Sequence, residues 1–257
     1  MMRPAIPNLP EDAVKSHHKL LGVVLDRSLK FHEHCLYVRH KVEKRARCWN
    51  MIQKPTWGLS ISQMRALYVR EIQPVLSYAC AAWFIHSEGS LIKKKKWFLN
   101  KRTIEEIDAI QTDCLVQISR AFAGTDHHII HRELYLKPAS IWLEQVATNA
   151  RAAKLDAVVT EIVHPYRILW GDAKLCHDAV GGFPKRIAAE TKMRSEQQAR
   201  EWWAKFQKDR RKKTQGTHTP VGARGDWSPE ALKVHEKLLR PQSTMLIQLR
   251  SERIGLI

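Results

Sequence analysis

Apolar side chains recur every three or four residues along most of this 257-residue chain, and this spacing restricts its fold more than any other feature. Residues with this spacing lie on one face of an α-helix. Four such stripes are present, over Glu33 to Ile52, Ile61 to Val75, Ile104 to Phe122 and Trp142 to Ala157. The sequence therefore predicts a mainly α-helical protein whose helices pack their apolar faces together.

A short β-element is expected before the helices. Leu20 to Leu25 is an apolar run rich in β-branched residues, and Asp26-Arg-Ser28 after it contains turn formers. We expect a strand here that ends in a turn. Residues 1–18 are polar and rich in proline, and they predict a flexible lead-in.

The sequence also contains signals for the helix boundaries. Residues 55–58 break the first stripe, and Ser60 and Gln63 have the spacing of a capping box that starts the second. Pro74 lies inside the second stripe, where it removes a backbone hydrogen bond and is expected to kink or end the helix. Gly124 is the expected C-cap of the third helix.

The composition changes after Tyr166. A loosely defined domain boundary is expected at residues 166–185. It lies in the first part of a basic helical segment over residues 166–213. Arg194 to Lys213 is a charged helical run that contains Trp202 and Trp203. Residues 214–229 are rich in Gly, Thr and Pro and predict a linker, and residues 230–257 predict a tail of one or two short helices.

The chain carries 43 Lys and Arg residues against 26 Asp and Glu, a formal net charge of +17. This excess favours a polyanionic partner, with nucleic acid first and an anionic membrane surface second. No apolar run approaches the roughly 20 residues of a spanning helix, and no signal peptide is recognisable at the N-terminus. We expect an intracellular protein, in the nucleus rather than the cytoplasm, whose five widely spaced cysteines are reduced.

Basic residues gather in three places, which supply the candidate nucleic-acid-binding residues. The first group lies on the other faces of the first helix, the second in a polar segment over residues 86–102, and the third at the end of the charged run. These residues are Arg39, Lys41, Lys44, Arg45 and Arg47; Lys93, Lys94, Lys95 and Lys96; and Arg210, Arg211, Lys212 and Lys213. Their positive charge could neutralise phosphates.

The first and third of these groups have a second interpretation. An ordinary solvated helix surface is the alternative for the first group, and it is favoured for any lysine taken by itself. The run from Arg210 to Lys213 also fits a nuclear import signal. Aromatic pairs adjoin two of the groups, at Trp97-Phe98 and Trp202-Trp203. These rings could stack on bases or belong to the core.

Motifs for catalysis or metal binding are weak. His32-x-His34 beside Cys35 and His127-His-x-x-His131 lack the second ligand pair of a zinc site, so surface or loop histidines are expected. The densest acidic group, Glu105-Glu-x-x-Asp108, fits an exposed first turn of a helix. Gly-rich phosphate loops and the Gly-x-Ser-x-Gly elbow are absent from the sequence. No cofactor and no metal site is predicted.

Several segments resemble, in the same order, the reverse transcriptases of non-LTR (LINE-type) retrotransposons. Leu21-Gly-Val-x-Leu-Asp-x-x-Leu-x-Phe-x-x-His34 resembles the strand pair that closes the palm. Ile72-Gln-Pro-Val-Leu-Ser-Tyr78 resembles the end of a thumb helix. The last segment, from Leu232 to Leu256, is weakly similar to the region before the Cys/His knuckle of fungal Tad-type elements.

The resemblance implies an end-of-palm strand and turn over residues 19–34 and a helical thumb and connector over residues 35–165. It implies RNA or an RNA–DNA hybrid as partner, together with a palm domain that this chain lacks. The family polymerises with an Asp-Asp turn, and this sequence has no Asp-Asp pair.

We therefore expect a non-catalytic fragment that binds the nucleic-acid backbone without polymerising. The alternatives are a helical protein-interaction module and a decayed remnant with no nucleic-acid role. A third alternative is that the fragment does not fold alone, because Leu20 to Leu25 has lost the sheet that it paired with.

Overall fold

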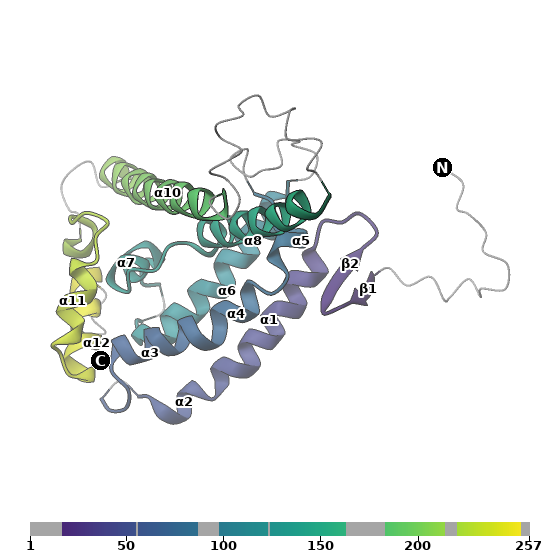
Figure 1. Ribbon diagram of the computed structural model, residues 1–257. Coiled ribbons are helices and arrows are strands. Elements are labelled where there is room, and N and C mark those ends of the chain that lie inside the picture. Colours follow the sequence, from purple (N-terminus) through teal and green to yellow (C-terminus); the bar gives the residue numbers. More distant parts are fainter. Residues whose placement is uncertain are drawn as a thin grey trace.

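The computed structural model describes residues 17–54, 56–86, 98–122, 124–162, 183–213 and 220–252. These residues form a small two-stranded sheet followed by helices, which confirms the expected fold class (Figure 1). In chain order the elements are β1 (His17–Leu20), β2 (Val23–Asp26), α1 (His32–Arg47), α2 (Trp49–Ile52), α3 (Ile61–Leu67), η2 (Tyr68–Ile72), α4 (Gln73–Leu76), α5 (Cys80–Trp83), α6 (Lys101–Ser119), α7 (His127–Glu133), α8 (Ala139–Ile162), α10 (Phe183–Lys213), η5 (Val221–Ala223), α11 (Glu230–Glu236) and α12 (Arg240–Ser251).

Helix α6 is the centre of the bundle. It contacts α1, α3, α7 and α8, and α10 lies along α8. The main core fills the space between these helices, and its largest fully buried side chains include Tyr68, Phe84 and Leu115. None of the described helices is both long and apolar enough to cross a membrane.

The N-terminal β-element is a hairpin, so the expected single strand over Leu20 to Leu25 is wrong. Strands β1 and β2 pair antiparallel, with His17 opposite Asp26 and Leu20 opposite Val23. Leu21 and Gly22 form the two-residue turn with φ values of 46° and 86°. Positive φ at both central positions matches the right-handed twist of the strands, and it divides the apolar run in two.

The expected turn at Asp26 is present, and its carboxylate organises it. The Asp26 Oδ atoms accept hydrogen bonds from the backbone N–H groups of Ser28, Lys30 and Phe31 at 2.9, 3.1 and 2.6 Å. These bonds lead the chain from β2 into α1. The apolar stripe that follows is buried at Val38, Val42, Ala46 and Trp49, as predicted, whereas Ile52 is 40% exposed because the helix breaks at Cys48 and α2 turns away.

The second stripe is confirmed in full, since Ile61, Met64, Tyr68, Ile72 and Val75 are all buried. The capping box is confirmed as well, with the Ser60 and Gln63 side chains each bonded to the other residue's backbone N–H.

The helical path does not end at Pro74; it continues through this residue into α4. A π-helical turn, η2, separates α3 from α4, and Pro74 lies in the first turn of α4. A π-turn supplies the extra residue that shifts the hydrogen-bond pattern, so the missing proline N–H falls at a helix start.

Two helical boundaries or faces differ from the prediction. Helix α6 ends at Arg120, which has a left-handed φ of 54°, and not at Gly124. In α8 the expected stripe is half-buried at Trp142, Val146 and Ala150 and exposed at Ala153, and the side chain of Ala157 lies outside the described residues. The buried residues lie one or two positions further along: Leu143, Glu144, Ala147, Thr148, Arg151 and Ala152. Because α8 contacts α5, α6 and α10, it buries polar side chains as well as apolar ones.

The C-terminal third is packed onto the bundle, so the expected linker over residues 214–229 is wrong from Pro220 onward. Ala223 and Trp227 are buried in a second apolar cluster with Ile129, Trp203 and Phe206. The charged run is confirmed as helix α10, and the tail is confirmed as two helices, α11 and α12. Strand β1 begins at His17, so the expected lead-in over residues 1–18 is wrong at its last two residues. The rest of the lead-in and most of the expected boundary region lie outside the described residues.

The cysteines in the described ranges are free. Cys35, Cys80 and Cys114 are buried and Cys48 is exposed. Burial raises the pKa of the Cys80 thiol to about 11 and that of Cys35 to about 12. These thiols therefore stay protonated and behave as small apolar core groups.

Candidate nucleic-acid interface

The prediction that Arg39 belongs to the free basic face of α1 is wrong, because its side chain pairs with carboxylates of a neighbouring helix. Its Nε lies 2.6 Å from Glu106 Oε1 and its Nη1 lies 2.7 Å from Asp113 Oδ2, both on α6. Glu43 is a third carboxylate at 3.9 Å. Arg39 therefore ties α1 to α6, and its charge is already neutralised.

The other four basic residues of α1 are exposed at the surface. Lys41 Nζ lies 4.5 Å from the centre of the Tyr37 ring, and Arg45 Nη1 donates to the Glu71 carbonyl oxygen at 3.2 Å. Lys44 and Arg47 complete the group, and Arg47 also lines a groove between α1 and α6. The basic face of α1 thus consists of Lys41, Lys44, Arg45 and Arg47.

The C-terminal end of α10 carries a denser group of positive charge. Residues 200–213 contain seven Lys or Arg and only two acidic residues. Lys208, Arg211 and Lys212 are exposed on one face of this helix, together with Ala204 and beside Gln207. We call these three residues the α10 basic cluster. Arg210 lies apart from it and pairs with Asp126 at 3.4 Å.

Two sets of candidate residues lie outside the part that the structure describes. These are Lys93, Lys94, Lys95 and Lys96 and the side chain of Lys213. Their expected role stays a prediction from the sequence.

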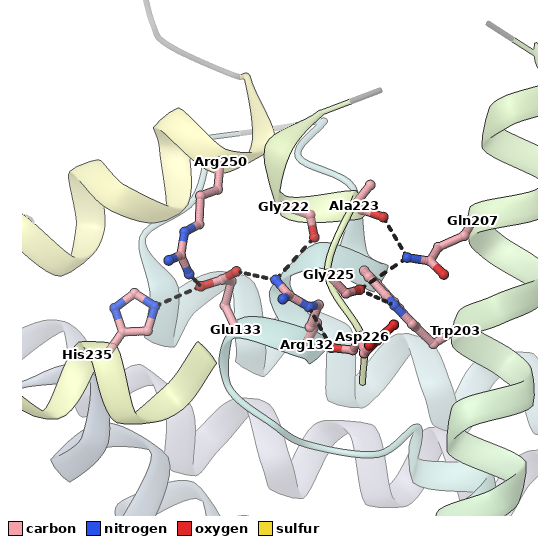
Figure 2. Close-up of polar contacts among 10 residues, drawn as sticks. All are labelled: Arg132, Glu133, Trp203, Gln207, Gly222, Ala223, Gly225, Asp226, His235 and Arg250. Atoms are coloured by element: carbon pink, nitrogen blue, oxygen red, sulfur yellow. Dashed lines mark hydrogen bonds and ion pairs between the residues drawn. The ribbon is translucent and has the colours of Figure 1, made fainter. Parts of the chain in front are cut away.

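Polar contacts on the inner face of α10 hold the helix in place (Figure 2). Trp203 Nε1 donates to the Gly225 carbonyl oxygen at 2.8 Å, and Gln207 Nε2 donates to the carbonyl oxygens of Ala223 and Gly225 at 2.8 and 3.1 Å. Trp203 is only 2% exposed. It is a core residue, so its alternative role in base stacking is excluded, and the α10 basic cluster is presented from a fixed helix.

The segment that holds α10 is itself anchored on α7 by a buried carboxylate. Glu133 accepts from Arg250 Nη1 at 2.6 Å, from Arg132 Nη1 at 3.1 Å and from His235 Nε2 at 3.0 Å (Figure 2). Arg132 continues the network to the carbonyl oxygens of Gly222 and Asp226. Sequence reasoning missed this network, because its partners lie up to 117 residues apart and share no motif.

The prediction of surface or loop histidines is wrong for His34 and His131. His34 is 1% exposed and His131 is 2% exposed. Burial, with Lys41 as a second cause, lowers the pKa of His34 to about 4, and burial lowers that of His131 to about 3. Both rings therefore stay neutral in the folded protein near neutral pH.

Asp126, His127 and His128 bring potential metal-ligand atoms within 4.8 Å of one another at the start of α7. Other contacts already use two of these side chains. Asp126 accepts from the His128 backbone N–H and pairs with Arg210, while the His128 ring stacks on Phe206 at a 4.2 Å centroid distance. In this structure the group joins α7 to α10.

The acidic group at the start of α6 is structural and not simply exposed, which corrects the prediction. Glu106 binds Arg39, and Asp108 accepts from the backbone N–H and the Oγ of Ser140, both at 2.8 Å. Burial raises the pKa of Asp108 despite these hydrogen bonds. The two carboxylates connect α6 to α1 and α8.

The two basic surfaces are separate. Helices α1 and α10 lie at opposite sides of the bundle in Figure 1, with α6 and α8 between them. Comparisons with protein-family models, curated proteins and solved structures find no match to this chain. The relationship to reverse transcriptases therefore stays a prediction from the sequence motifs.

Proposed function

We propose that this chain binds the phosphate backbone of RNA or of an RNA–DNA hybrid through basic side chains of α10 and α1, without polymerising. The observation that carries the proposal is the α10 basic cluster, in which Lys208, Arg211 and Lys212 are exposed on one face of the helix. The net charge of +17 supports it. Lys and Arg that neutralise phosphates release condensed counterions, which drives binding without regard to sequence.

The spacing within the α10 basic cluster favours a polyanion. Residues three and four apart on a helix are neighbours, with Cβ atoms about 5–6 Å apart. Lys208 precedes Arg211 by three residues and Lys212 by four, so its charge lies beside both of theirs and like charges gather on one face of the helix. Because a row of phosphates relieves the repulsion between these charges, binding is favoured at low salt.

The aromatic residues of α10 support backbone recognition over base recognition. Trp203 and Phe206 lie in the second core cluster, and Trp202 packs against it. Contacts from Lys and Arg to phosphates position a protein on nucleic acid but carry no sequence information. The proposed binding is therefore independent of sequence.

At the family level, we propose that the chain corresponds to the thumb, connector and tail of a non-LTR retrotransposon reverse transcriptase and acts in the nucleus. The ordered motifs from Leu21 to Tyr78 support this assignment. Two-metal polymerisation needs closely paired carboxylates, and the sequence contains no Asp-Asp pair. The reaction would depend on a palm domain supplied by another part of the parent protein.

A protein-interaction module is the second candidate, and α12 favours it. Leu239, Met245 and Leu249 are 71%, 61% and 48% exposed at and along this helix. Exposed apolar side chains that gather on one element often mark an interface. Such an interface would depend little on salt, because its affinity comes from apolar burial.

Fluorescence anisotropy with a labelled RNA–DNA hybrid separates the two candidates. Four phosphate contacts predict that raising the salt from 50 to 200 mM weakens binding about 100-fold. Absence of binding at 50 mM salt would contradict the nucleic-acid proposal. A matched measurement with a neutral-backbone oligonucleotide is the control, and it should show no binding.

A further inference from the structure

A groove of about 530 Å³ runs between α1 and α6, and its two ends differ in charge balance. At one end Arg39 faces Glu43 and Asp113, so its charge is compensated. At the other end the groove is lined by Arg47 and Arg120. The neutral side chains of Asn50 and Gln117 complete this second end.

Among the residues that the structure describes, Arg120 has only neutral partners. Its Nη2 donates to Asn50 Oδ1 at 2.9 Å and to the Gln53 carbonyl oxygen at 3.0 Å. Its Nε is buried and has no hydrogen-bond partner in the described structure. This guanidinium, at the end of the groove, therefore keeps its full charge, and its buried Nε is an unsatisfied donor.

Arg240, the first residue of α12, adds a second guanidinium next to Arg120. Its side chain also contacts Gln53, at 2.8 Å from Oε1, and the Ile118 carbonyl oxygen at 2.6 Å. Arg240 is only 4% exposed, and its Nε and Nη1 are buried without partners among the described residues. Burial and the neighbouring Arg120 lower the pKa of Arg240 to about 10, so it remains charged at neutral pH.

Other arginines with buried side chains differ from this pair. Arg65, Arg132 and Arg151 each have a carboxylate whose charge acts on them: Glu236, Glu133 and Glu144, respectively. For Arg120 and Arg240, the described part of the chain supplies no such carboxylate.

The end of α6 compensates this charge only in part. The C-terminal carbonyls of a helix carry about half a negative charge in sum, against two full positive charges here. The Ile118 and Gln117 carbonyl oxygens are already bonded, by Arg240 and by Gln53 Nε2. Within the described part of the chain, at least about one positive charge therefore remains without a counter-charge in a poorly solvated place.

We propose that the Arg47 and Arg120 end of this groove binds a phosphate group, with Arg120 as the direct ligand and Arg240 as the supporting charge. The ligand chemistry is an oxyanion, supplied either by free inorganic phosphate or by a phosphodiester of nucleic acid. The site does not depend on the proposed function, because free phosphate can bind where a nucleic acid does not. Guanidinium groups are well suited to it, since their planar donors match phosphate oxygens.

Equilibrium dialysis with radiolabelled inorganic phosphate, at constant ionic strength, tests the site. The wild-type chain should bind one phosphate saturably. Arg120→Gln should weaken binding by about tenfold or more, since it removes a charge-assisted contact. Arg240→Gln should weaken it less, because Arg240 acts through its charge and does not line the groove.

Arg65→Gln is the matched control. Arg65 also donates to backbone carbonyl oxygens, those of Leu134 and Tyr135, but it lies near a carboxylate. This variant should keep the wild-type phosphate affinity. Far-UV circular dichroism verifies that each variant is folded, and the partly exposed Arg120 keeps the test informative if Arg240→Gln unfolds.

Competition identifies the source of the phosphate. If an RNA–DNA hybrid displaces the labelled phosphate and Arg120→Gln weakens hybrid binding, the site holds a phosphodiester. If the hybrid leaves the labelled phosphate bound, the site holds free phosphate. Non-saturable binding by the wild-type chain, or equal affinity in Arg120→Gln and wild type, would overturn the proposal.

Discussion

Glu133 and His235 lie 102 residues apart in the sequence, yet the Glu133 carboxylate and the His235 ring meet at 3.0 Å where both side chains are fully buried. Arg250 reaches the same carboxylate oxygen at 2.6 Å (Figure 2). One side chain of α7 thus binds residues of both C-terminal helices. The tail is part of the fold, and it helps to position the segment on which α10 rests.

Glu133→Gln should destabilise the protein by about 3 kcal/mol, because Arg250 and Arg132 lose the carboxylate that compensates their charge in a buried place. Urea denaturation followed by circular dichroism measures this change. Glu106→Gln is the control, since it removes a carboxylate from an equally short but more exposed pair with Arg39. That variant should lose about 1 kcal/mol or less. Equal losses in both variants would contradict a central role for Glu133.

His34 should make stability depend on pH. Its Nδ1 accepts from the Val24 backbone N–H at 3.3 Å, and its ring packs edge-on against Trp83. The pKa of His34 is lowered from 6.5 to about 4 by burial and by Lys41. The unfolded chain therefore takes up a proton that the folded protein does not. The stability contribution is complete above about pH 6.5 and is lost as the pH falls toward 4.

Replacement of His34 should reduce this pH dependence. His34→Asn keeps an acceptor near Val24 and should lower the slope of unfolding free energy against pH by up to about 1.4 kcal/mol per pH unit between pH 6 and 4.5. Denaturant titrations at several pH values measure the slope. His40→Asn, at an exposed position of the same helix, should keep the wild-type slope, and the idea fails if the two variants behave alike.

The hairpin turn should tolerate a side chain at Gly22 poorly. A Cβ there would lie 2.8 Å from Cε1 of Tyr78, whose hydroxyl donates to the Leu21 carbonyl oxygen at 2.9 Å. Gly124 is a fair comparison, because it also has a positive φ but no atom within 4 Å of such a Cβ. Gly22→Ala should cost about 1 kcal/mol more than Gly124→Ala in thermal unfolding, since Tyr78 must move and lose its hydrogen bond. A smaller loss for Gly22→Ala would show that Tyr78 does not constrain the turn.

Local patterns predicted the parts of the fold that local forces determine. The capping box at Ser60 and Gln63 and the buried stripe from Ile61 to Val75 follow from helical spacing and hydrogen bonding within one turn. The hairpin turn at Leu21-Gly22 was missed although the signal is local. The apolar character of Leu21 concealed a turn that the glycine makes accessible.

Contacts between distant segments could not be predicted from spacing. Pro220 to Trp227 has the composition of a linker, but it is packed because Trp203, Gln207 and Arg132 bond to its carbonyl groups. For the same reason Arg39 resembled a surface charge in the sequence, whereas Glu106 and Asp113 come to it from another helix. The sequence predicted an excess of positive charge, but it could not predict which basic side chains are exposed and which are paired with carboxylates.

The most direct test of backbone binding by α10 compares two triple variants of the same helix. Lys208→Gln/Arg211→Gln/Lys212→Gln removes the α10 basic cluster. Lys185→Gln/Arg186→Gln/Lys192→Gln removes the same charge from exposed positions of α10. The nearest of these, Lys192, lies about 24 Å from Lys208 along the helix axis. Each protein is titrated with an RNA–DNA hybrid at several salt concentrations.

Loss of the α10 basic cluster should reduce the slope of log affinity against log salt by about 2 to 3, whereas the control variant should change it by less than about 1. An equal reduction in both variants would mean that net charge alone governs binding. That result, or an unchanged slope in the cluster variant, would contradict the proposed interface.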